Sequence, residues 1–176
     1  MDPPENDMPA GLLASRPVLR FGLPIAIGAA LAVIAVDQLS KHLVVDMMNL
    51  REAGEIDVFP GFAFRMAWNT GVNFGLLGGG GDAARLLLGG GATLLGVILI
   101  VSSMACRSMP SAIGIGVAGG GAIGNAIDRF NWGAVADFLN VSCCGLRNPW
   151  SFNIADIAVF VGFALLFLPR RGASRE

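Results

Sequence analysis

Charge is scarce in this chain of 176 residues: 14% of them are Asp, Glu, Lys or Arg, against about a quarter in an average soluble domain. Tyrosine is absent, and the chain has one histidine and three cysteines. His42 and the cysteines follow no metal-ligand spacing, so the sequence predicts no metal site, and it implies no other cofactor. Basic residues are scattered singly apart from Arg170-Arg171, which argues against a nucleic-acid partner.

Hydrophobic residues make up 54% of the sequence, and the mean hydropathy is +0.65. This composition indicates that lipid is the solvent. The length allows one domain of about four membrane-spanning helices with modest parts outside the membrane. We therefore predict a mainly α membrane protein with four transmembrane helices and a single domain over residues 16–171. Residues 1–15 are predicted to be a disordered cytoplasmic tail, and residues 172–176 a second cytoplasmic tail.

Four apolar runs are the predicted spans: residues 21–36, 86–106, 111–127, and a run from near Phe152 to Pro169. The first run is short, so a cleavable signal peptide is the alternative to a retained helix. No small-x-small cleavage site follows that run, which favours the retained helix. The third run carries glycines at four-residue spacing, a face that allows another helix to approach closely, at Gly116, Gly120 and Gly124.

Four spans would place both termini on one side of the membrane. Several arginines flank the spans on that side without nearby acids: Arg16, Arg20, Arg107, Arg170 and Arg171. The positive-inside rule then predicts that both termini are cytoplasmic. The long loops, which carry all three tryptophans, would lie on the outer side, where tryptophans serve as interfacial anchors.

The first outer loop contains an alternating segment. Phe62, Phe64, Met66 and Trp68 alternate with smaller or charged residues, the pattern of a half-buried strand, and Asn69-Thr70-Gly71 follows as a turn. A weaker alternation runs from Val135 to Val141 through Asp137, after the third span. We expect a small β-sheet at the outer membrane surface, with Asp137 on an extended segment beside the bilayer.

Carboxylates near hydrocarbon are unfavourable by roughly 2.5 to 3.5 kcal/mol at a helix centre and less at the boundary, so each needs an explanation. Four cluster at the outer boundary: Asp37, Asp128, Asp137 and Asp156. Lys41 follows Asp37 by four residues and would neutralise it on a helix. Arg129 directly follows Asp128. Both of these aspartates therefore have a cation nearby in sequence, which favours structural roles.

Asp137 and Asp156 have no cation within a turn. Two carboxylates brought together in a poorly solvated site share a proton, so one acts as a base while the other stays an acid. This division suits peptide hydrolysis, in which the base activates a water and the acid protonates the carbonyl oxygen. The alternative is that both residues are interfacial helix caps, and the residues alone do not choose between the two readings.

Five ordered blocks resemble the signature blocks of lipoprotein signal peptidase, also called signal peptidase II. The resemblance covers about residues 20–169, and five blocks in this order on four spans are highly specific. The blocks are Asp37-Gln-Leu-Ser-Lys41, Asn69-Thr-Gly71-Val-Asn-Phe74, Gly124-Asn125-Ala-Ile-Asp128-Arg129, Val135-Ala-Asp137-Phe138 and Phe152-Asn153-Ile-Ala155-Asp156.

The resemblance implies an intramembrane aspartic endopeptidase with Asp137 and Asp156 as its catalytic dyad. It also implies that a set of residues shapes the site or holds the substrate backbone: Asn69, Gly71, Asn125, Arg129 and Asn153. Asp37 and Lys41 are implied to support the site. One departure is Asn73, where many members of the family carry a small residue.

The family's substrate is a prolipoprotein whose cysteine carries a diacylglyceryl group, and cleavage falls just before that cysteine. The resemblance therefore implies a lipid-modified prolipoprotein and membrane lipid as partners, with no obligate protein partner. It also implies a bacterial cytoplasmic (inner) membrane location, with the active site at the outer, periplasmic boundary.

Other activities fit the sequence less well. Gly79-Gly-Gly81-Asp82 matches a block of presenilin-like and prepilin peptidases, but the Tyr-Asp partner of the presenilin type cannot exist in a chain without tyrosine. Ser40 and Lys41 would point about 100° apart on a helix, which disfavours a serine-lysine peptidase. A small transporter that uses the boundary carboxylates is the non-enzyme alternative, and the absence of a detectable internal repeat argues against it.

Overall fold

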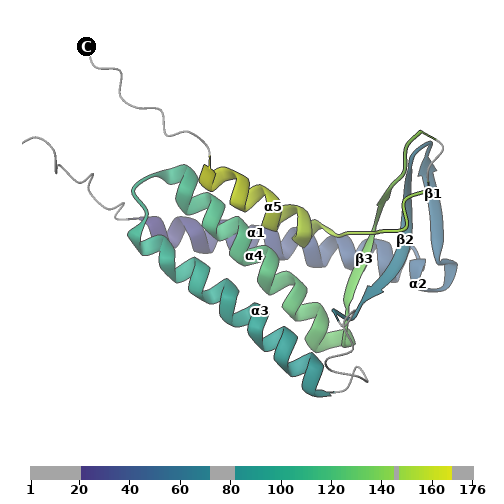
Figure 1. The fold of residues 1–176 in the computed structure, drawn as a ribbon, viewed down its shortest axis with the longest axis horizontal. Helices are drawn as coiled ribbons and strands as arrows, with labels where there is room; N and C mark the ends of the chain where they lie inside the picture. The colour runs from purple at the N-terminus through teal and green to yellow at the C-terminus, as the bar shows by residue number, and fades with distance from the viewer. Residues whose placement is uncertain (1–20, 72–81, 145–146, 168–176) are drawn as a thin grey trace, which may run out of the picture.

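A computed structural model describes residues 21–71, 82–144 and 147–167. The long helices lie side by side, and the strands form a sheet at one end of them (Figure 1). The predicted tails at residues 1–15 and 172–176, Asn73 and the glycines before Asp82 lie outside the described residues. The elements in chain order are α1 Gly22–Lys41, η1 His42–Met47, α2 Leu50–Ala53, β1 Glu55–Phe59, β2 Phe62–Asn69, α3 Asp82–Ser102, η2 Ser103–Ala105, α4 Met109–Trp132, β3 Val135–Val141 and α5 Ile154–Phe167.

The first helix is longer than the apolar run predicts. Instead of ending at Val36, α1 continues through Asp37 to Lys41 and then passes into the π-helix η1. Asp37 does not end the helix because Lys41, one turn later, forms an ion pair with it. The helix thereby places both charges on the same face.

Helix α4, the helix of the third predicted span, also extends beyond the predicted run on both sides. The Ser108 hydroxyl accepts the Ser111 backbone N–H at 3.4 Å, which caps the start of α4. Gly133 ends the helix in the left-handed conformation, with φ of 77°. As a result α4 carries Asn125, Asp128 and Arg129 within its last turns.

Two helical stretches among the described residues are long and apolar enough to cross a membrane. They are Gly22–Met47 and Asp82–Ala105, with mean hydropathies of 1.8 and 2.1. The described part of α5 is apolar but has 14 residues, and α4 does not reach the same hydropathy. The prediction of four spans is therefore not confirmed, and α4 and α5 as spans stay a prediction.

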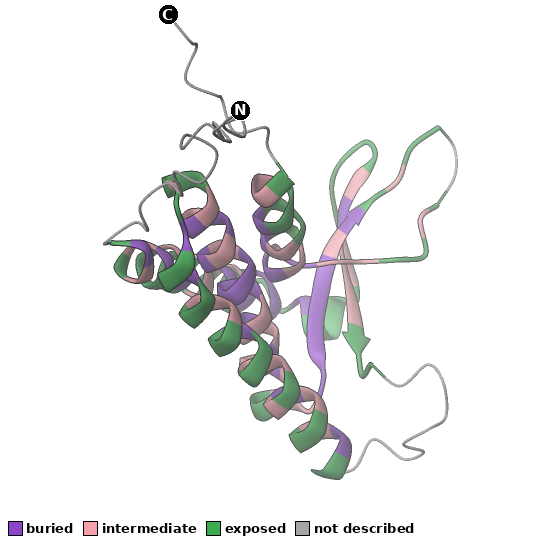
Figure 2. Ribbon diagram, turned by 60° about the vertical axis from the view of Figure 1, so that its left-hand side comes forward, coloured by how far each residue is buried: buried purple, intermediate pink, exposed green. Residues whose placement is uncertain are grey.

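Helix α4 lies at the centre of the bundle and packs against α1, α3 and α5. A side chain at Gly120 would come within 2.7 Å of the Ala30 carbonyl oxygen, and one at Gly116 would collide with the backbone of Ala26. The predicted small-residue face therefore lets α1 and α4 touch backbone to backbone. Figure 2 shows that the buried residues lie on the faces of the helices that turn toward one another. Helix α3 exposes large apolar side chains, including Leu86, Leu87, Leu94 and Ile98.

The sheet is antiparallel in the order β1-β2-β3. The predicted strands are confirmed as β2 and β3, whereas β1 was not anticipated because its residues show no alternation with a clear apolar face. One face of the sheet packs on a small core around Phe138 and Leu50, in which Phe64 and Met66 of β2 also take part. This core holds the sheet against α2 and η1. The opposite face of the sheet is turned toward the end of the helix bundle that carries the polar residues.

Candidate active site

Asp137 lies in the middle of β3, with only 4% of its surface exposed. Its partner across the strand pair is Ala67 of β2. Because Phe64 and Met66 pack on the core face, the alternation along β2 turns Ala67 and Asn69 to the opposite face. Asp137 therefore points away from the apolar core of the sheet and meets the polar residues of α4 and α5.

Asp156 lies in the first turn of α5, within the fourth apolar run of the sequence. The Asp156 backbone N–H donates to the Asn153 side-chain oxygen at 2.9 Å, and the Asn153 backbone N–H donates to the Asp156 carboxylate at 3.2 Å. This reciprocal arrangement is a capping box, and it satisfies two backbone N–H groups at the start of the helix. It also fixes the rotamer of the Asp156 side chain.

Asn153 joins the two candidate catalytic aspartates. Its side-chain amide donates to Asp137 Oδ1 at 2.6 Å while its backbone N–H holds Asp156. The same amide donates to Asn125 Oδ1 at 3.0 Å, and Asn125 in turn donates to Asp156 Oδ1 at 2.8 Å. Strand β3, helix α4 and helix α5 thus converge in one closed hydrogen-bond ring, which brings together four residues that the sequence predicted.

Arg129 lies beside this ring on α4. Its guanidinium donates to the Asn125 carbonyl oxygen at 3.3 Å, and its Nε is buried with no hydrogen-bond partner among the described residues. A side chain at Gly71 would approach Arg129 Nη2 to 3.6 Å, so the Gly71 turn lies directly over the guanidinium. Gly71 adopts φ of 70°, which favours glycine, and donates its N–H to Asn69 Oδ1. The predicted residues Asn69, Gly71 and Arg129 therefore border the same site.

A fully buried ion cluster lies behind the aspartates. Lys41 Nζ is 2.7 Å from a carboxylate oxygen of Asp37 and 2.7 Å from one of Asp128. All three residues have 0% exposed surface. The predicted Asp37–Lys41 pair is confirmed. The prediction that Arg129 neutralises Asp128 is wrong, because Asp128 turns toward Lys41 of α1 instead.

The ion cluster is connected to the backbone next to each candidate catalytic residue. Asp128 accepts the backbone N–H of Ala136 at 3.2 Å, and Asp37 accepts that of Ala155 at 3.0 Å. Ala136 and Ala155 directly precede Asp137 and Asp156 in the chain. The buried lysine thus anchors, through two carboxylates, the two backbone segments that carry the site.

The electrostatic environment of Asp137 favours its protonated form. Burial, followed by the negative charge of Asp156, raises the pKa of Asp137 to about 6, and hydrogen bonds from Asn69 and Asn153 oppose this rise. No ion pair to Asp137 or Asp156 is formed within the described residues. Asp137 therefore stays partly protonated at a higher pH than an ordinary aspartate, up to about pH 6.

Comparison with known proteins assigns this arrangement to a family. A family model described as signal peptidase (SPase) II matches residues 29–169, which include every candidate site residue named above. The chain belongs to the signal peptidase II family. It is 36% identical to a lipoprotein signal peptidase of Rhodopseudomonas palustris over 81% of this chain and 90% of that protein. It is 37% identical to one of Nitrobacter hamburgensis over 85% of this chain and 91% of that protein.

Two solved structures of bacterial membrane enzymes share the fold of this chain. One, described as a bacterial membrane enzyme at 1.9 Å resolution, matches with a TM-score of 0.67 and 25% identity over 81% of this chain and 90% of that one. A second bacterial membrane enzyme matches in fold with a TM-score of 0.66 at 23% identity, over 86% of this chain and 95% of that one. The chain is therefore a membrane protease of a family that processes lipoproteins.

Sequence reasoning missed two features of the site. Gln38 donates to Asp128 at 3.0 Å and to Asp37 at 3.1 Å, so it completes the ion cluster, and Asp128 belongs to that cluster although the sequence paired it with Arg129. Gln38 lies within the first signature block, between Asp37 and Lys41, and this position was the available signal. Asp128 likewise lies within the third signature block, but contacts between α1 and α4 are not encoded in local spacing, so its pairing with Lys41 could not be predicted.

Proposed function

We propose that this protein is an intramembrane aspartic endopeptidase that removes the signal peptide from diacylglyceryl-modified prolipoproteins and cuts just before the lipidated cysteine. The observation that carries the proposal is the bridge from Asp137 through Asn153 to Asp156. Uncharged amide groups hold both carboxylates, so the pair is free to share one proton. Family membership supports the same reaction.

In the proposed mechanism the ionised member of the pair takes a proton from a water molecule, which attacks the scissile carbonyl carbon. The protonated member donates to the carbonyl oxygen, and the tetrahedral intermediate collapses as the leaving amine takes a proton. Asn153 and Asn125 hold the carboxyl groups in position. Arg129, with a buried N–H that has no described partner, is suited to bind a substrate carbonyl beside the Asn69–Gly71 turn.

Lipid anchoring of the substrate supplies orientation in this proposal. The acyl chains stay in the bilayer while the peptide bond is held at the membrane boundary, so the substrate reaches the site already aligned. The exposed apolar faces of α1 and α3 support this placement, because large side chains such as Leu31, Leu87 and Leu94 face outward. We infer an inner-membrane protein of four spans with cytoplasmic termini and the aspartates at the periplasmic boundary.

The test uses the purified protein in detergent micelles with two precursors of the same sequence, one diacylglyceryl-modified and one unmodified. Mass spectrometry should detect a released signal peptide and a product that begins with the lipidated cysteine, only from the modified precursor. The Asp137→Asn variant serves as the negative control. Cleavage of both precursors at equal rates, or at another bond, would contradict the proposal.

A further inference from the structure

A disulfide joins two adjacent residues, Cys143 and Cys144, directly after strand β3. Both cysteines are exposed. They belong to the β3–α5 connection, residues 142–153, of which 145–146 lie outside the described part. This connection joins the strand that carries Asp137 to the helix that carries Asp156, so any change in its conformation acts on the segment between the two aspartates.

The backbone at the disulfide is unusual. Cys144 adopts φ of 60°, in the left-handed region that residues with a side chain rarely occupy. The disulfide closes a small ring that includes the peptide bond between the two cysteines. Opening this ring would remove the constraint and let Cys144 return to an ordinary backbone conformation.

Hydrogen bonds fasten the connection on either side of the disulfide. The Ser142 backbone N–H donates to the Gly61 carbonyl oxygen at 2.8 Å, and the Ser142 hydroxyl accepts the Asn148 backbone N–H at 3.0 Å. The buried Asn140 amide donates to the carbonyl oxygens of Asn148 and Trp150. The described part of the connection is therefore ordered by a polar network that includes the residue next to the disulfide.

The same connection ends at the candidate active site. Phe152 pairs with Leu139 of β3 through backbone hydrogen bonds, and Asn153 follows with its contacts to Asp137 and Asp156. The physical link thus runs from the disulfide through the Asn148–Trp150 segment to the asparagine that bridges the aspartates.

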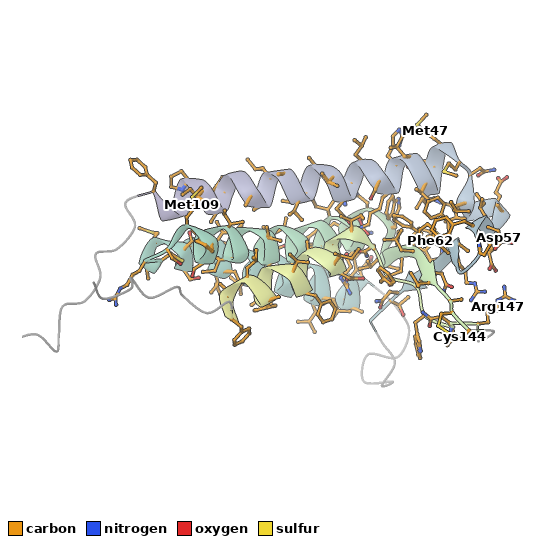
Figure 3. The ribbon with its side chains drawn as sticks, turned by 90° about the horizontal axis from the view of Figure 1, so that it is seen from above. Met47, Asp57, Phe62, Met109, Cys144 and Arg147 are labelled. Atoms are coloured by element: carbon orange, nitrogen blue, oxygen red, sulfur yellow. A yellow bond between two sulfur atoms is a disulfide. The ribbon has the colours of Figure 1, made fainter. Side chains whose placement is uncertain are left out.

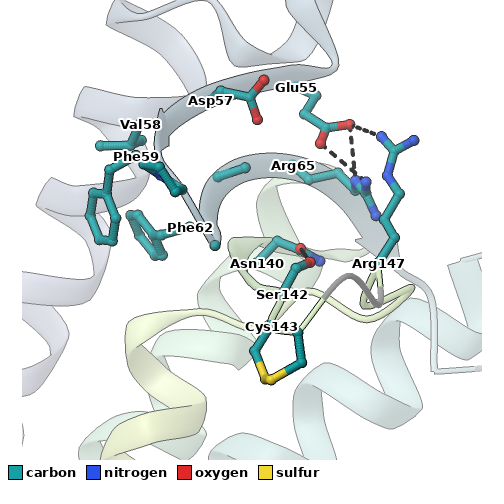
Figure 4. Close-up of a pocket in the computed structure, with 14 residues that line it drawn as sticks. Glu55, Asp57, Val58, Phe59, Phe62, Arg65, Asn140, Ser142, Cys143 and Arg147 are labelled. Carbon is teal, nitrogen blue, oxygen red and sulfur yellow. Dashed lines mark hydrogen bonds and ion pairs between the residues drawn. A yellow bond between two sulfur atoms is a disulfide. The ribbon is translucent and has the colours of Figure 1, made fainter.

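The disulfide is accessible from solvent. It lies in the wall of a cavity of about 1090 Å³, which Phe62, Ser142 and Arg147 also line (Figure 4). None of the candidate catalytic residues lines this cavity. In Figure 3, Cys144 and Arg147 lie at the sheet end of the molecule, far from Met109 at the other end. A reductant can therefore reach the sulfur atoms without entering the active site.

We propose that Cys143 and Cys144 form a thiol–disulfide exchange site for a dithiol reductant, and that its redox state adjusts the active site through the β3–α5 connection. A thiolate of the reductant attacks one cysteine sulfur, which breaks the S–S bond and releases the other sulfur as a thiolate. The second thiol of the reductant then resolves the mixed disulfide. Two electrons and two protons pass to the cysteines, and the reductant becomes a disulfide.

The first experiment measures the redox state of the full-length protein in micelles with a thiol-alkylating reagent and peptide mass spectrometry. Cys143 and Cys144 should resist alkylation as isolated, and both should become alkylated after dithiothreitol treatment. Hydrogen exchange of the backbone amides at residues 142–144, 147, 148 and 150 should accelerate after reduction. Alkylation of both residues without a reductant would overturn the proposal.

The second experiment compares cleavage of the lipidated precursor by the oxidised and the reduced protein. Reduction should slow cleavage by about two- to fivefold, because a looser connection positions Asn153 less well. The double variant Cys143→Ser with Cys144→Ser should cleave at the slower rate and ignore the reductant. The control variant Cys106→Ser, which changes the cysteine outside the connection, should keep the response.

Equal kcat and KM in the two redox states, or a reductant response that persists in the double variant, would overturn the link to the active site. The cleavage measurement rests on the proposed function, whereas alkylation does not. If neither redox state cleaves the precursor, the proposed function fails, and alkylation still decides whether the exchange site exists.

Discussion

Two pairs of aspartates lie near one another in the bundle, and their negative charges are balanced in different ways. Asp37 and Asp128 both contact the ammonium group of Lys41 at 2.7 Å. Asp137 and Asp156 are held by the side chains and backbone of asparagines. The first pair is fully buried with its cation, and the second lies beside the turn and the arginine that border the site.

The difference separates a fixed charge from an exchangeable proton. The ammonium group of Lys41 contacts both carboxylates of the first pair, and its removal would leave buried negative charge without a partner, which is strongly unfavourable. Asp137 and Asp156 have amide partners instead of a cation, so they can share a proton. The fixed pair holds the backbone at Ala136 and Ala155, and the exchangeable pair follows each of them by one residue. Rigid support and variable protonation are thus divided between neighbouring residues.

Removing the exchangeable pair should produce the largest effect. We expect Asp137→Asn or Asp156→Asn to lower cleavage of the lipidated precursor by about 10²- to 10⁴-fold while the protein still folds. The reason is that an asparagine amide can act neither as the general acid nor as the general base. Released signal peptide measured by mass spectrometry checks this. Asp46→Asn changes an exposed carboxylate and serves as the control.

Asp128→Asn should behave differently from the dyad variants, with a loss of yield or stability at least as large as its loss of rate. The comparison between the two pairs would collapse if Asp128→Asn, Asp137→Asn and Asp156→Asn all retained the same residual cleavage.

Removing the cation that Asp37 and Asp128 share should destabilise the folded protein. Lys41→Met leaves two buried carboxylates without a counter-charge, and we expect a loss of roughly 3 to 5 kcal/mol in stability. Thermal unfolding in micelles measures the change. The triple variant that adds Asp37→Asn and Asp128→Asn should recover most of the loss, because no unpaired charge remains. An unchanged melting temperature for Lys41→Met alone would show that the cluster does not support the fold.

The exchangeable pair should make the protein less stable as the pH rises. Because the pKa of Asp137 is raised to about 6, its contribution to stability is fully present below pH about 3.8 and is lost as the pH rises through about 6, by up to about 3 kcal/mol. Asp137→Asn should lack this loss. Melting temperatures of both proteins from pH 4 to pH 8 check the expectation, and parallel curves would refute it.

Chelation should have the smallest effect. A water-activating pair of carboxylates needs no ion, so exhaustive treatment with EDTA should leave cleavage intact. The measurement is activity after chelation and again after addition of magnesium, calcium or zinc. Loss of activity with rescue by one specific metal would mean that Asp137 and Asp156 are metal ligands, and the aspartic mechanism would have to be abandoned.

The sequence by itself determined the local features of this protein. Apolar runs located the long helices, and strict alternation located β2, because each depends only on residues a few positions apart. The spacing of Asp37 and Lys41 predicted their ion pair on one helix face. The five signature blocks predicted which residues gather around Asp137 and Asp156, and the structure brings those in its described part together.

Only the tertiary structure decided the contacts between distant elements. Lys41 reaches Asp128 because α1 and α4 approach through glycines, whereas the sequence paired Asp128 with its neighbour Arg129. The bridge through Asn153 likewise depends on how β3 meets α5. Local spacing carries no information on which of two nearby cations a buried carboxylate will face. That choice follows from the packing of helices, which sets the distance and the burial of each pair.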